Sequence, residues 1–293
     1  MERIILGYDG STAALSALNW TAARAAQGPT KVDVVLVVSP LFEERATERQ
    51  HLGKAEALLL ERVPGLDVTV HRLEGAVTKS IAWASEDADL VVVGINPGHA
   101  IRAAASGWMP LRLSTRAAAP VCMIPVGWTH TDDPVTVGVA SDESSDSALD
   151  FAAAEALKTA TDLRLVHTWL MPTPAFDAST VVVVTPDEVI EDHWRVLDGA
   201  VKRVLREHPA LSVKRELIRD SRSAGLLRFD GRSSLIVIGT HRRGVLVSSI
   251  LGSVGQEILW RAECPICIVP PRLGASAARR AMAAPVSTDY WRR

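Results

Sequence analysis

The sequence has few cysteines, little net charge and no long apolar run. Three cysteines among 293 residues do not indicate a disulfide framework. The net charge of −2 argues against a nucleic-acid-binding protein that depends on bulk positive charge. No apolar run is long enough to span a membrane, and residues 1–6 enter a strand with no signal peptide before it. We therefore expect a cytoplasmic protein with no membrane span and no nucleic-acid partner.

The sequence also lacks the common catalytic and metal-binding signatures. The histidines are scattered, and no His/Asp/Glu cluster has the spacing of metal ligands. Cys264 and Cys267 form a CxxC, which permits a redox or metal role, but without a second cysteine pair the start of a strand is the favoured interpretation. No histidine is fixed near Ser253 by sequence, so no nucleophile–base–acid set and no dedicated catalysis are expected.

Composition and an internal repeat indicate two domains. Hydrophobic residues make up 47% of the chain and charged residues 23%, enough to build a full core. Three features recur 145 positions apart: Gly94 with Gly239, Gly107 with Gly252, and residues 120–125 with 265–270.

Near the start of each half the offset is smaller, because residues 18–23 recur 131 positions later as 149–154. The second half therefore holds about 14 extra residues, which we assign to the Pro/Thr-rich segment 171–186. The predicted domains are residues 1–128 and 129–270, and residues 271–293 are expected to form a flexible tail.

Each half alternates apolar strands with helices. Nearly all-apolar strands separated by helices predict a mainly parallel sheet with helices on both faces. The fold class is thus α/β, with two tandem doubly wound domains of five strands each. In the first half, helices are expected at 13–26, 42–62, 78–86 and 111–118. The expected strands are 4–6, 32–38, 68–73, 90–93 and 121–126, then 135–139, 163–167, 213–218, 235–238 and 266–269.

The last strand of each half, 121–126 or 266–269, would be an exposed sheet edge. Pairing the two strands with each other would hide both edges and make the halves a pseudo-twofold dimer. A further homodimer stays open. Ligands of such sheets bind beyond the carboxyl ends of the strands, which places the candidate site at the turns after the first and fourth strands of each half.

Residues 239–254 suit a phosphate. An apolar strand leads into Gly239, and a helix is predicted to open on Gly252-Ser253. The free N–H groups and the dipole of such a helix start favour negative charge. The spacing is Gly, two residues, Arg242, nine residues and Gly-Ser, without the Gly-Lys-Ser/Thr of a Walker motif.

Six segments together resemble a tandem universal stress protein: 5–11 (ILGYDGS), 88–94 (ADLVVVG), 165–167 (LVH), 239–241 (GTH), 251–254 (LGSV) and 264–270 (CPICIVP). The resemblance implies that many members bind ATP, with which Mg²⁺ can be present, and that some hydrolyse it slowly. It also implies that an aspartate after the first strand contacts the adenosine, and that chain near the end of the second strand holds adenine. A Gly-x2-Gly-x9-Gly-Ser/Thr motif would hold ribose and phosphates.

Carried over to the first half, the resemblance assigns Asp9 and Gly10 to the adenosine, backbone near Val37 to adenine, and Gly94 and Gly107 to the phosphates. The phosphate motif is nevertheless poor there. Pro97 stands at its second glycine and lacks an N–H, and Trp108 replaces the small hydroxyl residue after Gly107.

The second half has the opposite defect. Backbone near Thr168 would hold adenine, and Gly239, Gly252, Ser253 and Val254 match the phosphate motif. Ala140 replaces the aspartate, and Asp142 would substitute for it only in a rearranged turn. Arg242 either blocks the approach of the ribose or reaches the phosphates. His241 either contacts the ligand or is an ordinary loop residue.

Two functions remain open after this comparison. The first is a stress-response protein that binds ATP weakly or in one half only, regulatory rather than catalytic, with the second half as the better site. The alternative is a nucleotide-free interaction or scaffold protein on the same fold, with degenerate ATP sites and an unknown protein partner. Ala140, Pro97 and Trp108 are the residues that favour the alternative.

Overall fold

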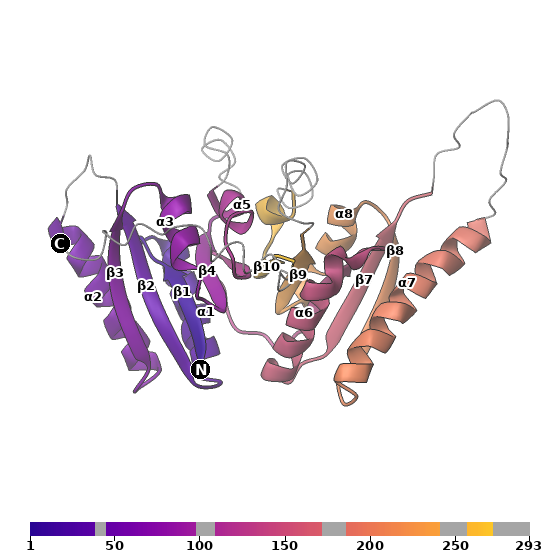
Figure 1. Cartoon of the computed structure of the whole chain (residues 1–293), viewed down its shortest axis with the longest axis horizontal. Helices are drawn as coiled ribbons and strands as arrows, with labels where there is room; N and C mark the ends of the chain where they lie inside the picture. Colours follow the sequence, from indigo (N-terminus) through magenta and orange to yellow (C-terminus); the bar gives the residue numbers. More distant parts are fainter. Residues whose placement is uncertain (39–44, 98–108, 172–185, 241–256, 272–293) are drawn as a thin grey trace, which may run out of the picture.

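The computed structural model describes residues 1–38, 45–97, 109–171, 186–240 and 257–271, and its ten strands form one sheet (Figure 1). The strand order is β3-β2-β1-β4-β5-β10-β9-β6-β7-β8. The strands are β1 Glu2–Gly7, β2 Thr30–Val38, β3 Asp67–Glu74, β4 Leu90–Ile95, β5 Val121–Pro125, β6 Val135–Val139, β7 Leu163–Trp169, β8 Val213–Arg219, β9 Leu235–Gly239 and β10 Ile266–Val269. All ten predicted strands are confirmed, most with small extensions.

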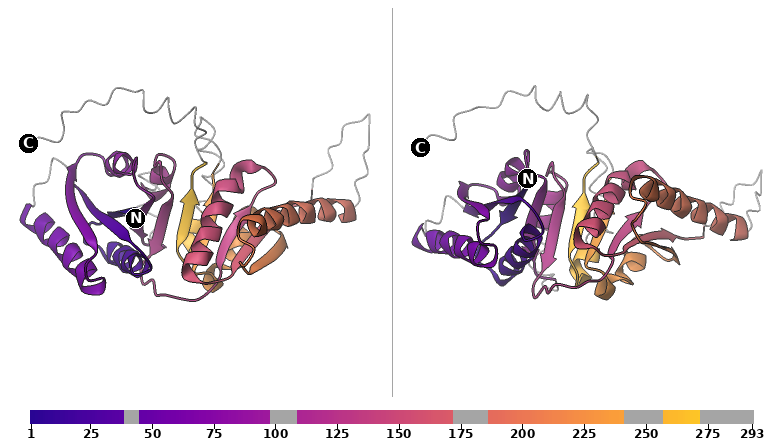
Figure 2. Two further views of the ribbon diagram at one scale, coloured as in Figure 1. Left: turned by 60° about the horizontal axis from the view of Figure 1, so that its bottom comes forward. Right: turned by 90° about the horizontal axis from the view of Figure 1, so that it is seen from below.

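The two halves meet where β5 pairs with β10. Every other strand pair in the sheet is parallel, and this pair alone is antiparallel. Cys122 lies opposite Cys267, with Met123 opposite Ile266 on one side. The prediction that the last strands hide each other's edges is confirmed, and we call this β5–β10 pairing the joint. Figure 2 shows the chain crossing from one half to the other between β5 and β6.

Alternating side chains of the strands build one apolar cluster on each face of the sheet. One cluster combines strand residues such as Leu6 and Val92 with the inner sides of α1, α2, α6 and α7. The other combines residues such as Ile5 and Val93 with α3, α5, α8 and the helical residues 257–261. The helices are α1 Thr12–Ala25, α2 Arg45–Arg62, α3 Val77–Ala84, α5 Met109–Ser114, α6 Asp146–Thr159, α7 Pro186–Glu207 and α8 Arg222–Leu227, with short 3-10 turns η1 Glu143–Ser145 and η2 Asp230–Arg232.

Helix ends differ from the predictions by a few residues. Ser11 caps α1, because its Oγ accepts the N–H of Ala14 at 3.1 Å. Helix α5 ends at Ser114 rather than at residue 118. Hydroxyl groups in its last turn bond nearby carbonyls, as Ser114 Oγ does with Leu111 O at 2.8 Å. Helix α3 ends two residues before the predicted 86. The predicted start of α2 at 42, the insertion at 172–185 and the tail from 272 lie outside the described residues.

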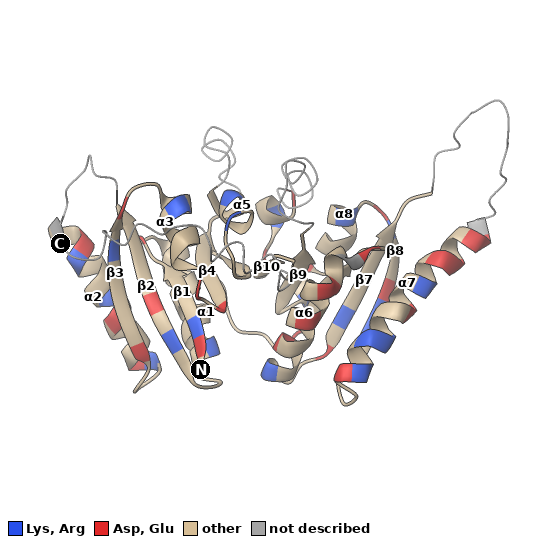
Figure 3. Ribbon diagram, viewed as in Figure 1, with Lys and Arg blue, Asp and Glu red and all other residues tan. Residues whose placement is uncertain are grey.

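The two strands of the joint carry no charged residue. Figure 3 shows residues of both signs along α2 and α7, at the two ends of the molecule, whereas β9 and β10 carry no charged residue. In the part of the chain that the structure describes, no helix is long and apolar enough to cross a membrane.

Equivalent residues of the two halves bond the segment before the last strand to the turn before the fourth strand. In the first half, Ser85 Oγ accepts the N–H of Ala118 at 3.2 Å. In the second half, the carboxylate of Asp230 accepts the N–H groups of Glu263 at 2.8 Å and Cys264 at 3.0 Å. Asp230 is 7% exposed, so its charge is stabilised by these backbone donors.

We expect Asp230→Ala to lower the free energy of unfolding by roughly 2–3 kcal/mol, because it strands two N–H groups and removes a charged acceptor. The matched change Ser85→Ala removes one neutral acceptor and should cost about 1 kcal/mol. Urea unfolding followed by circular dichroism measures both. Equal losses in the two variants would contradict the larger contribution that we assign to the Asp230 carboxylate.

Candidate nucleotide site

The register of the first half brings its predicted site residues to one edge of the sheet. Gly7, the last residue of β1, lies opposite Val35 of β2 and Val93 of β4. The chain just beyond these positions includes Asp9 with Gly10, Val37 and Gly94. These residues therefore gather at the carboxyl ends of three adjacent strands, where ligands of doubly wound sheets bind.

The second half repeats this arrangement. Val139, the last residue of β6, lies opposite His167 of β7, and β6 pairs on its other side with β9, which ends at Gly239. Ala140 and Thr168 each lie one residue further along their strands. The alanine thus stands where the register of the first half places the turn that contains Asp9.

Gly94 and Gly239 allow the turn after the first strand to pass directly over the end of the fourth. A Cβ on Gly94 would lie 2.1 Å from the carbonyl carbon and oxygen of Ala13, at the start of α1. A Cβ on Gly239 would lie 2.3 Å from the carbonyl oxygen of Ser144 in η1. No side chain fits at either distance, so packing alone requires glycine at both positions.

The turns that carry the acidic residues differ between the halves. In the first half, the carboxylate of Asp9 accepts the N–H of Ser11 at 3.0 Å, immediately before α1. In the second half, the carboxylate of Asp142 accepts the N–H of Ser144 at 3.0 Å, and Ser145 Oγ accepts the N–H of Ala140 at 3.2 Å. Each half therefore has an exposed acidic residue that bonds the N–H two residues on, but in the second half it sits two residues later.

His51 of α2 crowds the first-half turn. Gly10 has φ +80, and a Cβ there would lie 2.7 Å from the imidazole ring of His51. Tyr8 lies beneath the turn and is 4% exposed. Burial, together with the charge of Asp9, raises the pKa of the Tyr8 phenol.

A histidine pair that the sequence did not predict lies at the edge of the second half. Buried His167 donates from Nδ1 to the carbonyl of Val139 at 2.7 Å, so its Nε2 accepts from Nδ1 of His193 at 2.8 Å. The His193 ring stacks on Trp169 at a centroid distance of 5.3 Å, and Arg219 lies over the same indole. His167 stands where the first half has Leu36, and this exchange was the signal that sequence reasoning could have used.

The remaining predicted positions, Gly107, Trp108, His241, Arg242, Gly252, Ser253 and Val254, lie outside the described residues. The CxxC does not form a paired site in the structure: Cys264 and Cys267 are buried free thiols, and Cys267 belongs to β10. Burial raises the pKa of the Cys264 thiol, and the charge of Asp230 adds to this shift. The described ranges contain no group of three or more His, Cys, Asp or Glu residues that could hold a metal ion.

Known proteins resemble this chain in sequence and in fold. The model of the universal stress protein family matches residues 1–125 and again residues 133–270. A universal stress protein of Mycolicibacterium smegmatis is 25% identical over 92% of this chain and 97% of its own length. One from Mycobacterium tuberculosis (strain H37Rv) is 27% identical over 90% of this chain and 96% of its own. The crystal structure of a universal stress protein from Archaeoglobus fulgidus shares the fold, with a TM-score of 0.66, 17% identity and coverage of 92% and 98% of the two chains.

The close approach at Gly94 and Gly239 predicts a packing defect when either gains a methyl group. We expect Gly94→Ala and Gly239→Ala each to lower the free energy of unfolding by about 1–3 kcal/mol, because backbone must move to admit the Cβ. Gly53→Ala is the control, since Gly53 lies in α2 with nothing within 4 Å of its Cβ. It should raise stability by about 0.5–1 kcal/mol. Thermal and urea unfolding measure the stability of all three variants. If Gly94→Ala and Gly239→Ala were as stable as the parent, the packing argument would be wrong.

The histidine pair predicts a loss of stability in mild acid. Burial lowers the pKa of His167 below its ordinary 6.5, and His193 and Arg222 contribute to the shift. The unfolded chain therefore takes up a proton before the folded one, so the contribution is complete above pH 6.5 and is lost as the pH falls through the lowered value. His167→Leu, which installs the residue of the first half, should make the free energy of unfolding less dependent on pH between 7.5 and 5.5.

Urea unfolding at both pH values measures this difference. His130→Gln is the control, because it removes an exposed imidazole that lies outside the His167–His193 pair. An unchanged pH dependence in His167→Leu would rule out His167 as its source.

Proposed function

The chain belongs to the universal stress protein family, and on that premise we propose that it binds adenine nucleotide, ATP with or without Mg²⁺, at the carboxyl edge of its second half. In this proposal the nucleotide regulates a stress response, and the protein does not turn it over as a dedicated enzyme. The site is weak, and the first half contributes little to binding.

The observation that carries this proposal is that the second half keeps Gly252 and Ser253 on the chain that leaves β9 beside the turn after β6. A Cβ at Gly239 would touch Ser144, so the chain that leaves β9 starts directly beside the turn that follows the first strand of the half. That chain continues to Gly252 and Ser253, which complete the phosphate motif in sequence. The first half offers the same meeting at Gly94, but its motif contains Pro97 and Trp108 instead.

Weak affinity follows from the residue at position 140. Ala140 has no carboxylate for an adenosine, and the nearby Asp142 carboxylate already accepts the N–H of Ser144. Losing a hydrogen bond to a charged group costs roughly 1.5–3 kcal/mol, which is about ten- to a hundred-fold in affinity. We therefore expect binding at high micromolar to millimolar ATP.

The regulatory assignment rests on the chemistry near the site. Both ring nitrogens of His167 are engaged, one by the Val139 carbonyl and one by His193, so this imidazole is not available as a general base.

A scaffold without nucleotide is the second candidate, and the crowding of the first-half turn favours it. The His51 ring already packs against Gly10, the residue after Asp9. If the second half were equally closed, the fold would serve as a surface for a protein partner. The two candidates differ in whether purified protein takes up ATP.

Isothermal titration calorimetry with millimolar ATP, with and without Mg²⁺, tests the proposal. We expect one weak site per chain in the parent, and no binding to Gly252→Val, because a branched side chain would obstruct the phosphates. Gly107→Val is the matched control, because it alters the equivalent glycine of the degenerate first-half motif, and it should bind as the parent does.

The parent protein should also release adenine nucleotide on denaturation when it is purified rapidly. An absence of heat at millimolar ATP, with no nucleotide released, would leave the scaffold as the remaining candidate. Loss of binding in Gly107→Val with retention in Gly252→Val would move the site to the first half.

A further inference from the structure

We propose that a buried ion pair at the joint, Arg24 with Glu155, decides which halves can pair. The joint accepts a first half with a second half and rejects like pairs, above all two second halves. The partner that this surface fits is therefore the other half of the same chain. It does not fit a second copy joined through like halves.

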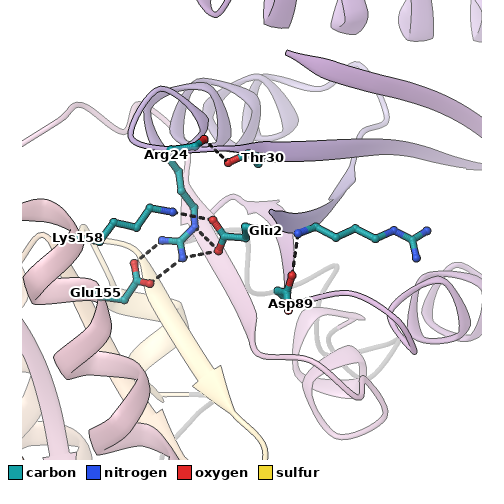
Figure 4. Close-up of polar contacts among 8 residues, drawn as sticks. Glu2, Arg24, Thr30, Asp89, Glu155 and Lys158 are labelled. Atoms are coloured by element: carbon teal, nitrogen blue, oxygen red, sulfur yellow. Dashed lines mark hydrogen bonds and ion pairs between the residues drawn. The ribbon is translucent and has the colours of Figure 1, made fainter. Parts of the chain in front are cut away.

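The ion pair links α1 of the first half to α6 of the second (Figure 4). Nη2 of Arg24 donates to one carboxylate oxygen of Glu155 at 2.7 Å, and Nη1 donates to the other. Arg24 is 7% exposed and Glu155 is 4% exposed. The guanidinium also bonds Glu2, at 2.7 Å, and Lys158 reaches the second oxygen of Glu2 at 2.6 Å. Two cations and two carboxylates thus alternate across the joint.

The two halves are related by a pseudo-twofold axis that passes between Cys122 and Cys267. These cysteines occupy equivalent positions in the repeat and face each other across the antiparallel strands. On either side of them the pairing crosses over, with Met123 opposite Ile266 and Val121 opposite Ile268. In a two-fold antiparallel pair, only residues at the axis face their own equivalents.

Arg24 and Glu155 are also equivalent positions. They are 131 residues apart, the offset that relates residues 18–23 to 149–154. Across the axis, each therefore faces its own counterpart. If two copies of one half met at the same joint, residue 24 would face a second residue 24, or residue 155 a second residue 155.

Like pairing would place like charges in this buried position. Two Glu155 carboxylates would meet without the guanidinium that now binds both oxygens, and an uncompensated buried charge is strongly destabilising. The position equivalent to Glu2 is Asp133, which would add further negative charge. The second half offers Lys158 as a cation, whereas in the first half Glu2 accompanies Arg24 directly. The rejection is therefore strongest between two second halves.

A cut chain tests the proposal, because its halves are free to choose partners. Residues 129–132 of the connection between the halves are exposed, so a protease site can be inserted there and cleaved in the folded full-length protein. The cut protein is then unfolded in urea, refolded and counted by native mass spectrometry. Random pairing would give two mixed pairs for every pair of two first halves, and two for every pair of two second halves. We expect the ratio of mixed pairs to like pairs of either kind to exceed this chance value by about tenfold or more, which corresponds to about 1.4 kcal/mol.

The double substitution Arg24→Met with Glu155→Leu is the control. It replaces the buried pair by apolar side chains of similar size, a change that buried ion pairs often tolerate without loss of stability. The cut variant should pair close to chance, with like pairs of the second half now present. Equal preference for mixed pairs in parent and control, or chance pairing in the parent, would overturn the proposal.

A charge exchange in the intact chain gives an independent test that needs no separated halves. Arg24→Glu and Glu155→Arg should each lower stability, because each places like charges at the axis. The variant with both substitutions should have a folding equilibrium constant at least about tenfold larger than that of either single variant. An exchanged variant no more stable than either single variant would also overturn the proposal.

Discussion

The antiparallel pairing of β5 with β10 is the constraint on which the rest of the molecule depends. Each half alone would end in an apolar strand with unpaired N–H and C=O groups, and such an edge invites association with other chains. Joining the two edges removes both and fixes the pseudo-twofold axis at Cys122 and Cys267. The positions of α1 and α6, and thus the contact between Arg24 and Glu155, follow from that axis.

The repeat has kept positions while exchanging the chemistry at them. Ser85 and Asp230 each accept a backbone N–H from the segment before the last strand, one as a hydroxyl and one as a carboxylate. Leu36 is an ordinary core residue, while its counterpart His167 bonds a carbonyl and a second imidazole. Each of these contacts lies within one half, so one half can change its chemistry without a matching change in the other.

The fold could be predicted closely because its signals are local or repeated. Apolar runs identify the strands, and the offset of 145 by itself aligns Cys122 with Cys267. The contacts that distinguish the halves were not predicted, because they join residues far apart in sequence. Arg24 and Glu155 each look like a polar residue on the surface of a helix, and only the register of the joint shows that the two are buried against each other. His167 and His193 likewise meet only through the packing of α7 on β7.

The glycines at the candidate site show why a match to a sequence motif is not by itself evidence of a binding site. Gly94 and Gly239 match the first position of a phosphate motif, yet packing requires both, because a Cβ on them would lie 2.1 and 2.3 Å from neighbouring backbone atoms. The first half keeps Gly94 although Pro97 and Trp108 break the rest of its motif, which is what a packing requirement predicts. The first glycine therefore carries no information on nucleotide binding in either half. That information has to come from the other positions of the motif, Gly252 and Ser253 in the second half, which is why the proposed function rests on them rather than on the strand end.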